Sequence, residues 1–576
     1  MPVRVKVYVN EDDALLYWII AAPIAACRGF AIERRMTDAA GVSSRAFLPN
    51  RIGFANEPVP PPDPDSPPIK PSTEWPFQRF SWTDHDADTG DTASYRVVPV
   101  IRQGTDLVQV DAESSDWSPP QTLGADAVGD FQPFFNRGFV ISQFIARYLA
   151  QRNMTLEQFK DTIGHKDDTT IRRFLSGDLR LALLREVQLA RSEDGEVYAA
   201  LFELSDQELL DALVGLGPRA HVVLANGSIT KGKTEALADA RKRDENKTAR
   251  DALIAAGVDV EADRRFISPG PLGHNKFLVR TGSTGHPLSV WTGSTNWTPT
   301  GLCTQVNNGL LVKDRDVAAI YLDQWHRLRD AGNTFPPALT SANATPKAVG
   351  DDVPGTVRSV TWFTRTAQRK DLAALEAEIQ RAQQGILFLM FMPGSTGLFP
   401  AVMARAAEPG FYVRGVVSEL PNGGTDESAV DISLVSGKNH VGAHFDILQP
   451  EGIENSMAWF AAEVTHKQFL AHIGYAIIHS KVLVIDPFSD DPTVVTGSHN
   501  FSTSASSSND ENFMIIKGDK ALAESYAVNI VGAYSHYVWR VYLSETHRPF
   551  NGLKDNDTWQ APKLAANKAD LTFWGL

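Results

Sequence analysis

The chain has 576 residues, which is more than one hydrophobic core usually serves, so we expect several domains. Hydrophobic residues make up 43% and charged residues 22%, which excludes wholesale disorder, and no apolar run reaches the roughly 18 residues that span a bilayer. The formal net charge of −14 argues against bulk attraction to DNA or an anionic membrane, and two cysteines cannot form a disulfide framework. An anionic substrate would therefore need a local positive pocket.

The N-terminal stretch from Ala14 to Ala26 is apolar and is followed by Cys27, like a bacterial lipoprotein cleavage site. Acidic residues 11–13 stand where a signal peptide needs basic ones, and alternating valines at residues 3–9 are typical of a half-buried strand. We therefore expect strands here and, by default, a cytoplasmic location. Secretion by a signal-independent route, or as a lipoprotein through Cys27, is the alternative.

Residues 1–105 are expected to form an all-β domain, because short alternating runs are separated by turn-rich segments. Trp18 and Tyr95 resemble the core Trp and late-strand Tyr of a fibronectin type III or immunoglobulin-like sandwich. Such a domain would either dock a protein, glycan or substrate, or serve as a structural appendage. The expected strands are Val3–Val9, Leu15–Ile20 and Tyr95–Ile101, with an extended loop at Pro58–Pro71.

Residues 106–190 are predicted to be a helical connector, since apolar residues from Phe139 to Leu149 follow a 3.6-residue period and Thr155 resembles a helix start. The pattern then alternates between strands and helices twice, which is typical of an α/β fold. We expect one α/β half at residues 191–331, a linker at 332–357, a second half at 358–545 and a C-terminal tail at 546–576.

An internal repeat carries the residues with chemistry. Each copy has a His-x-Lys pair followed by a Gly-Ser-x-Asn element, and the spacing from the His to the Asn is 22 residues in the first copy and 21 in the second. Nine residues after that Asn, each copy has a run of polar residues that we call the tail of the motif, and its members are the tail residues. The first copy is His274, Lys276, Gly293, Ser294, Asn296, Gln305, Asn307 and Asn308. The second copy is His479, Lys481, Gly497, Ser498, Asn500, Asn509, Glu511 and Asn512.

This repeat resembles the signature of the phospholipase D superfamily, the HKD phosphodiesterases, over residues from about 180 to 545. The resemblance implies two phospholipase D-like α/β sandwich halves packed face to face around one active site, preceded by the all-β sandwich. Asp486 completes the second motif, whereas Thr281 stands at the matching position of the first and Asn307 stands where the second copy has Glu511. Both departures leave the acid–base roles of the first half open.

The resemblance implies a metal-independent reaction in which one imidazole attacks phosphorus and the other transfers protons. We expect no cofactor and no metal ion. If Glu511 crosses to the other half and orients His274, then His274 is the nucleophile and His479 the general acid. The remaining catalytic residues would be Lys276, Asn296, Lys481 and Asn500, and the supporting ones Asp486, Ser294, Ser498 and Asn307.

The substrate expected from the resemblance is a phospholipid, which would be hydrolysed or used for phosphatidyl transfer, with peripheral contact to a membrane. A nuclease of the same superfamily is the first alternative, since its chemistry would be identical and only the pocket walls would differ. A non-catalytic scaffold with a degenerate first motif is the second. Residues 420–470 form an insertion before the second motif, which is either a lid or acceptor-binding wall or an ordinary surface excursion.

Overall fold

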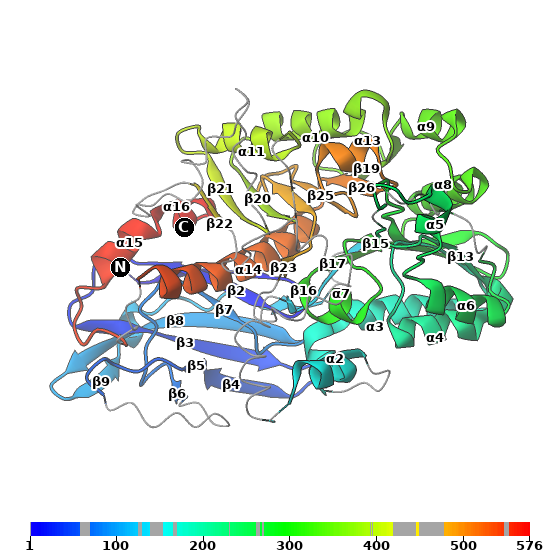
Figure 1. The fold of residues 1–576 in the computed structure, drawn as a ribbon. Helices are drawn as coiled ribbons and strands as arrows, with labels where there is room; N and C mark the ends of the chain where they lie inside the picture. The colour runs from blue at the N-terminus through cyan, green and yellow to red at the C-terminus, as the bar shows by residue number, and fades with distance from the viewer. Residues whose placement is uncertain are drawn as a thin grey trace.

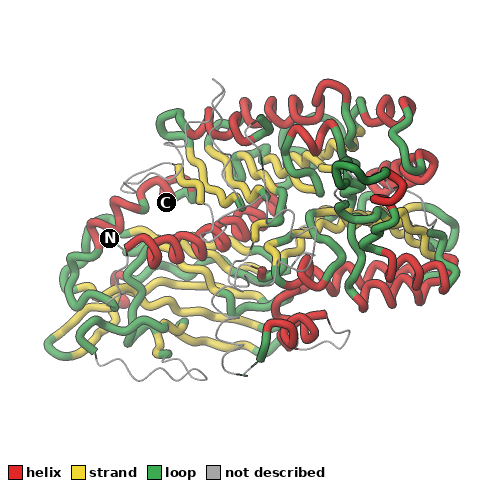
Figure 2. The backbone as a smooth tube through the Cα atoms, in the orientation of Figure 1, coloured by secondary structure: helices red, strands yellow, loops and turns green. Residues whose placement is uncertain are grey.

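The computed structural model describes residues 2–57, 69–124, 129–138, 152, 154–164, 170–229, 231–260, 265, 267, 270–391, 393, 396–418, 445–448, 477–546 and 552–576. An all-β body at the N-terminus is followed by two mixed α/β halves (Figure 1). Figure 2 shows helices, in red, over the outer faces of both halves, and one long helix that runs through the middle of the molecule. The fold class is therefore the one that the sequence predicts.

The N-terminal body consists of two sheets that pack against each other. The Trp18 side chain is fully buried, and its ring lies 5.8 Å from that of Phe30 in the opposite sheet. The Tyr95 hydroxyl donates a hydrogen bond to Asp84 at 2.9 Å. The smaller sheet has the order β1 (Arg4–Val9), β2 (Ala14–Ile19), β7 (Ser81–Asp84). The larger sheet has the order β10 (Gln121–Thr122), β8 (Thr92–Gln103), β3 (Cys27–Thr37), β4 (Ser43–Phe47), and β9 (Asp106–Gln109) also pairs with β8. Strands β5 (Pro49–Asn50) and β6 (Lys70–Pro71) form a separate pair.

This body reaches past the predicted boundary at residue 105, because two further short strands join its larger sheet. The first part of the N-terminal apolar stretch forms β2, as the strand interpretation predicted. Cys27 is a fully buried residue at the start of β3.

The first α/β half contains a six-stranded sheet in which all neighbours are antiparallel except the last pair. Its first strand comes from the segment that we predicted to be a helical connector. Five residues with a central proline carry too little alternation to be recognised as an edge strand. The order is β11 (Phe131–Phe135), β17 (Asn308–Val312), β15 (Pro287–Gly293), β14 (Lys276–Thr281), β12 (Val197–Leu201), β13 (Ala220–Leu224).

The second half repeats this sheet with one strand added at each edge. Its inner six strands have the same order and the same directions as the sheet of the first half, so the repeat extends from the motif to the fold. The added strand β18 and helix α9 (Pro337–Asn343) both lie in the predicted linker. The order is β18 (Lys347–Val349), β19 (Arg358–Phe363), β26 (Asn512–Lys517), β25 (Thr493–Gly497), β24 (Val482–Ile485), β20 (Gly385–Met390), β21 (Tyr412–Val417), β22 (Phe445–Leu448).

Each half closes with a helix that reaches into the other half. The Tyr321 hydroxyl, on the closing helix of the first half, donates to Asn512 Oδ1 at 3.0 Å. Reciprocally, Asn308 Nδ2 donates to the hydroxyl of Tyr526, on the closing helix of the second half, at 2.9 Å. The helices are α2 (Leu156–Gly164), α3 (Thr170–Ser192), α4 (Gln207–Leu216), α5 (Leu237–Arg241), α6 (Lys247–Ala255), α7 (Pro299–Cys303) and α8 (Arg315–Ala331) in the first half, and α10 (Lys370–Arg381), α11 (Phe399–Ala406), α13 (Thr503–Ser507) and α14 (Lys520–Thr546) in the second.

The C-terminal segment, with α15 (Gln560–Ala566) and α16 (Lys568–Phe573), packs on the N-terminal body (Figure 1). The Tyr8 hydroxyl donates to the carbonyl of Trp574 at 2.5 Å, and Arg28 forms an ion pair with Asp555 at 2.8 Å. Strand β1 also contacts α14, where the backbone N–H of Val9 donates to Glu524 at 3.1 Å. The all-β body is thus packed onto the rest of the chain.

Three predicted features lie mostly or wholly outside the described residues: the helical pattern from Phe139 to Leu149, the proline-rich loop at Pro58–Pro71 and the insertion at residues 420–470, of which only β22 is described. Within the part of the chain that is described, no helix combines the length and the apolar composition needed to cross a bilayer.

Candidate active site

The two His-x-Lys pairs lie where the halves meet. The backbone N–H of His274 donates to the carbonyl of Asp510, and that of His479 donates to the carbonyl of Val306, both at 2.9 Å. Each histidine precedes its strand, β14 or β24, because its backbone hydrogen bond goes to the opposite half. The parallel pair β16 (Gln305–Val306) and β23 (Ile477–Ile478) joins the halves at the same place.

Both lysines of the repeat are buried beside these histidines. Lys276 Nζ donates to the carbonyl of His274 at 2.9 Å, and Lys481 Nζ donates to the carbonyl of His479 at 2.5 Å. The exposed fraction is 2% for Lys276 and 0% for Lys481. Two buried ammonium groups give this acidic protein the local positive charge that an anionic substrate requires.

A phenylalanine follows the strand next to each His-x-Lys pair. The ring of Phe202, after β12, lies edge-on to His274 at 4.8 Å, and Phe391, after β20, lies edge-on to His479 at 5.1 Å. The ammonium groups of Lys276 and Lys481 lie 5.0 and 4.8 Å from the same two rings. Sequence reasoning missed both phenylalanines, although they occupy matching positions after equivalent strands.

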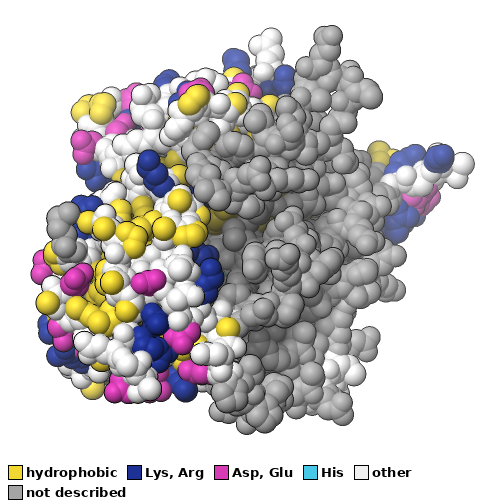
Figure 3. All heavy atoms as spheres, turned by 90° about the vertical axis from the view of Figure 1, so that its left-hand side faces the viewer, with side chains coloured by type: hydrophobic (Ala, Val, Ile, Leu, Met, Phe, Trp, Pro, Cys, Tyr) yellow, Lys and Arg dark blue, Asp and Glu magenta, His cyan; other side chains and the backbone are white. Residues whose placement is uncertain are grey.

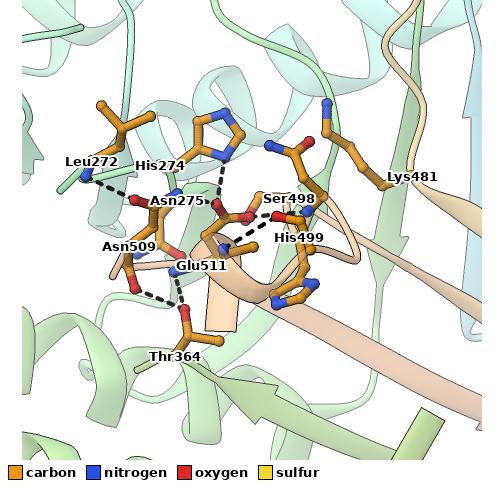
Figure 4. A network of polar contacts seen from close by, with 12 residues as sticks. Leu272, His274, Asn275, Thr364, Lys481, Ser498, His499, Asn509 and Glu511 are labelled. Carbon is orange, nitrogen blue, oxygen red and sulfur yellow. Dashed lines mark hydrogen bonds and ion pairs between the residues drawn. The ribbon is translucent and has the colours of Figure 1, made fainter. Parts of the chain in front are cut away.

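Glu511, from the second half, lies beside the histidine of the first half. Its Oε1 atom is 3.4 Å from Nδ1 of His274 and accepts a hydrogen bond from Asn509 Nδ2 at 2.8 Å (Figure 4). Its Oε2 atom accepts from the backbone N–H of Asn500 at 3.2 Å. Although burial raises the pKa of Glu511, the contact with His274, the nearby ring of His499 and the hydrogen bond from Asn509 bring the pKa down to about 2, so the carboxylate is ionised at neutral pH.

His274 is neutral under the same conditions. Burial and the neighbouring ammonium of Lys276 lower the pKa of His274 to about 4, although Glu511 opposes this shift. A neutral imidazole with a carboxylate at Nδ1 presents the lone pair of Nε2, which is the protonation state that nucleophilic attack requires.

Asn307 occupies the mirrored position at the other histidine. Its Oδ1 atom lies 2.8 Å from Nδ1 of His479 and also accepts from the hydroxyl of Ser294 at 2.7 Å. Its Nδ2 donates to the carbonyl of Gly301 at 2.9 Å. Each histidine is therefore contacted at Nδ1 by a tail residue of the opposite half, which is a carboxylate in one case and an amide in the other.

Two residues outside the repeat hold these tail residues. The backbone N–H of Asn307 donates to Asn136 Oδ1 at 2.8 Å, and that of Glu511 donates to Thr364 Oγ1 at 2.9 Å. Asn136 directly follows β11, and Thr364 directly follows β19, so they too are equivalent. Sequence reasoning missed both, because β11 was not recognised as part of the first half.

The Gly-Ser-x-Asn elements follow β15 and β25. A Cβ atom at Gly293 would lie 2.5 Å from the carbonyl of Asn308, so only glycine allows this close approach.

Asn296 Nδ2 donates to the carboxylate of Glu203, a further residue that sequence reasoning missed, at 2.9 Å. Oδ1 of Asn296 and Oδ1 of Asn500 are buried polar atoms with no hydrogen-bond partner among the described residues. Ser498, the counterpart of Ser294, accepts from the backbone N–H of Asn512 at 3.1 Å.

Asp486 lies at the far end of β24 and braces that end. Its carboxylate accepts hydrogen bonds from three consecutive backbone N–H groups, those of Gln383, Gln384 and Gly385, at 2.6–2.9 Å. Thr281, at the matching position of the first copy, exchanges hydrogen bonds with the backbone of Glu196. The replacement of Asp by Thr thus changes a contact at the strand end and leaves the groups around the histidines in place.

No group of three or more His, Cys, Asp or Glu side chains arranged to hold a metal ion occurs among the residues that the structure describes.

The family model described as "Cardiolipin synthase, PLD-like domain" matches residues 375–530, which include the whole second copy of the repeat. This segment is a phospholipase D-like domain. The sheet of the first half has the strand order of the phospholipase D-like second half, although the family model does not extend to it. A search of curated protein sequences finds no match to the chain.

Several solved structures are similar to the chain. The phosphatidylserine synthase of Haemophilus influenzae Rd KW20 is 12% identical over 70% of this chain and 94% of that one, with a TM-score of 0.42. Nuc from Salmonella typhimurium, a phospholipase D family member, is 19% identical over 31% of this chain and 96% of that one, with a TM-score of 0.22. The polyphosphate kinase of Porphyromonas gingivalis is 10% identical over 89% of this chain and 74% of that one, with a TM-score of 0.36.

Proposed function

We propose that the chain is a metal-independent phosphodiesterase of the phospholipase D superfamily that acts through a phosphohistidine intermediate. The observation that carries this proposal is the reciprocal contact between the halves, in which Glu511 lies beside His274 and Asn307 beside His479. Neither half alone holds a histidine together with the group that contacts it at Nδ1, so the two halves form one site.

In the first step, Nε2 of His274 attacks the phosphorus atom and expels the leaving oxygen, which His479 can protonate. In the second step, water or an alcohol loses a proton to His479 and attacks the phosphohistidine, which restores His274. Glu511 orients His274 and balances the positive charge that its ring gains when the P–N bond forms.

Lys276 and Lys481, with Asn296 and Asn500, are proposed to bind the non-bridging phosphate oxygens. Their charges and dipoles are fixed before the substrate binds, and Lys276, Lys481 and Asn296 are buried, so these groups stabilise the extra negative charge of the transition state at little cost in reorganisation. Ser294 is proposed to position Asn307 through the hydrogen bond that its hydroxyl donates. Ser498 is proposed to position the tail that contains Glu511 by accepting a hydrogen bond from the backbone N–H of Asn512.

The proposed substrate is a phospholipid, which would be hydrolysed or used for phosphatidyl transfer. On the face drawn in Figure 3, Lys and Arg side chains are interspersed with Asp and Glu, and hydrophobic side chains lie between them. The described part of this face therefore carries no continuous basic stripe of the kind that nucleic acid prefers. Nuclease activity is the second candidate function.

The test is phosphodiesterase activity of the purified protein in the presence of EDTA. The substrates are bis(p-nitrophenyl) phosphate, phosphatidylcholine and phosphatidylethanolamine vesicles, and single- and double-stranded DNA, each assayed with the wild-type, His274→Ala and His479→Ala proteins. We expect turnover that both substitutions abolish, with a lipid preferred over DNA. Turnover unaffected by the substitutions, or no turnover of any substrate, would favour a non-catalytic scaffold.

A further inference from the structure

His499, the third residue of the second Gly-Ser-x-Asn element, is fully buried and has no role in the proposed steps. Its ring points away from His274 and Lys481 (Figure 4). Nδ1 accepts a hydrogen bond from the backbone N–H of Phe501 at 3.0 Å, and Nε2 lies 3.2 Å from Oδ2 of Asp371. Both ring nitrogens are therefore engaged inside the second half, and the ring does not act on a substrate directly.

These contacts fix the tautomer of the ring. Because an N–H donates to Nδ1, that atom carries a lone pair, and the proton of the neutral ring is on Nε2, where it faces Asp371. The hydroxyl of Ser506 donates to Oδ2 of Asp371 at 2.7 Å, and that of Thr366 donates to Oδ1. Although burial raises the pKa of Asp371, the contacts with His499, Thr366 and Ser506 hold it below its ordinary value, so the carboxylate is ionised at neutral pH.

The hydrogen bond at Nδ1 closes a turn around Asn500. It runs from the side chain of His499 to the backbone of Phe501, and Asn500 lies between these two residues. Phe501 has a φ of 55°, in the left-handed region that a residue with a Cβ atom rarely adopts, so the turn needs support. The backbone N–H of Asn500 donates to Glu511 at 3.2 Å. A looser turn would therefore move both the Asn500 side chain and a hydrogen bond that Glu511 accepts.

The first half holds its asparagine in a different way. The side chain of Asn296 is held directly, because its Nδ2 donates to the carboxylate of Glu203. Glu203 follows Phe202, and the residue that follows the equivalent Phe391 in the sequence is Met392, which has no carboxylate. The second Gly-Ser-x-Asn element therefore requires another means of fixing its asparagine, and the turn closed by the histidine supplies one.

We propose that His499 is a positioning residue of the site: with its proton held on Nε2 by Asp371, its Nδ1 atom fixes the turn that directs Asn500 toward a non-bridging oxygen of the substrate. This inference rests on the proposed function and adds to it a group that touches neither phosphorus nor the leaving oxygen. Since Asn500 is proposed to stabilise charge in the transition state, the loss of His499 should lower kcat more than it raises KM.

The first test compares two amides, each of which replaces one nitrogen of the ring. In His499→Asn, Oδ1 takes the place of Nδ1 and can accept from Phe501, whereas the longer amide of His499→Gln reaches the place of Nε2 and leaves that N–H without its acceptor. The assay uses bis(p-nitrophenyl) phosphate with EDTA present, and kcat is expressed per folded molecule.

We expect His499→Gln to lose about 100-fold or more in kcat, which is the effect of removing one preorganised group from a transition state. His499→Asn should keep a kcat at least about tenfold above that of His499→Gln, and KM should stay within about threefold for both. Equal values of kcat, the reverse order, or a change confined to KM would overturn the inference.

His221→Gln is the matched control. Both ring nitrogens of His221 are also engaged, by Glu196 at 3.4 Å and by Asp259 at 3.2 Å, but this histidine lies near the start of the edge strand β13. Its substitution should leave kcat within about threefold of the wild-type value. A loss equal to that of His499→Gln would show that any disturbed histidine has this effect, and it would overturn the inference.

The second test asks whether His499 acts through Asn500. In the Asn500→Ala protein, the group to be positioned is already missing, so adding His499→Gln should lower kcat by less than about tenfold. Losses that multiply in the double variant would mean independent roles and would overturn the inference while leaving the phosphodiesterase proposal intact. No turnover by the wild-type protein would instead contradict the proposed function, and this inference with it.

Asp371→Asn keeps the test decisive if neither His499 variant folds, because the amide has the volume of the carboxylate. It removes the charge that holds the proton on Nε2, so we expect kcat to fall at least about tenfold with KM within about threefold. Asp206→Asn is the matched control, since Asp206 is also a buried carboxylate at a helix start, paired with Arg172. It should lower Tm but leave kcat per folded molecule within about threefold. Unchanged kcat in Asp371→Asn, or an equal loss in Asp206→Asn, would overturn the inference.

Discussion

Oε1 of Glu511 lies 3.4 Å from Nδ1 of His274, and these two residues belong to different halves of the chain. The contact places an ionised carboxylate behind a neutral imidazole at the interface of the halves. The same interface fixes the backbone of His274 through the carbonyl of Asp510. Any change that separates the halves would therefore separate the proposed nucleophile from its orienting group.

Replacing Glu511 by Gln should lower kcat about 100-fold or more, because the amide removes the charge that balances the imidazolium. Steady-state kinetics on an aryl phosphodiester, with thermal unfolding measured alongside, would check this. Asp490→Asn is the matched control, since its exposed side chain pairs with Lys520 at the surface, and it should change kcat less than about threefold. Equal activity of Glu511→Gln and the control would contradict the role of Glu511.

His274 should remain neutral down to about pH 4, well below the pH at which an exposed histidine becomes protonated. Histidine ¹³Cε1 NMR as a function of pH, with the signal assigned through His274→Gln, would measure this. Glu511→Gln should lower the pKa of His274 further, because the carboxylate favours the protonated ring. A His274 signal that titrates near pH 6.5 would contradict the buried, lysine-flanked environment.

The same pKa shifts predict the sign of the acid dependence of stability. Because His274 binds its proton more weakly when folded, the unfolded chain takes up more protons between about pH 6.5 and 4, and this site loses stability as the pH falls through that window. The lowered pKa of Glu511 acts in the same direction from about pH 4.5 down to 2. Urea unfolding at pH 7 and pH 5 should show wild type losing more stability on acidification than His274→Gln.

The repeat predicted the histidines, lysines and tail residues, because each has a partner at nearly the same spacing in the other copy. It could not predict Phe202, Phe391, Asn136 or Thr364, which lie outside the motif. All four residues directly follow strands that occupy the same position in the two sheets. The two sheets can be matched strand by strand only when β11 is known to belong to the first sheet. The sequence between β11 and the rest of that sheet is long, so no local pattern joins them.

The predicted linker at residues 332–357 contains a helix and a short strand. The linker at residues 332–357 has the composition of a loop, but Pro337–Asn343 form a helix that begins with a proline, which is favourable at the first helical position. Lys347–Val349 pair with β19 and extend the second sheet. Three residues are too few for a period-two pattern to register in the sequence.

Asp486→Ala should destabilise the fold without disabling the chemistry. The substitution leaves three backbone N–H groups at the start of β20 without their acceptor, at a cost of about 1–3 kcal/mol for each group that stays buried. Thermal unfolding should show a lower Tm, whereas kcat per folded molecule should stay within about threefold of the wild-type value. Thr281→Ala, which removes a weaker contact, should shift Tm less. A large loss of kcat at unchanged Tm would instead place Asp486 in the reaction.

Asp510→Asn should destabilise the interface of the halves. The carboxylate of Asp510 forms two hydrogen bonds with the guanidinium of Arg265, at 2.6 and 2.7 Å, and both side chains are almost fully buried. Breaking one partner of such a pair leaves a buried charge and costs about 3–5 kcal/mol. Lys242→Ala, at an exposed ion pair with Asp239, should shift the urea midpoint far less, because solvent screens such a pair. Urea unfolding of both variants would check the difference, and equal effects would contradict it.

The most direct test of the account is to find where the phosphoryl group is attached during turnover. The His479→Gln protein, mixed with an activated phosphodiester and quenched in alkali to preserve phosphohistidine, would be digested and its peptides analysed by mass spectrometry. We expect a covalent adduct on His274, because the first step proceeds while the base that completes the second is missing, and no adduct in the His274→Gln protein. An adduct on His479 in the wild-type protein, or turnover with no histidine adduct at all, would contradict it.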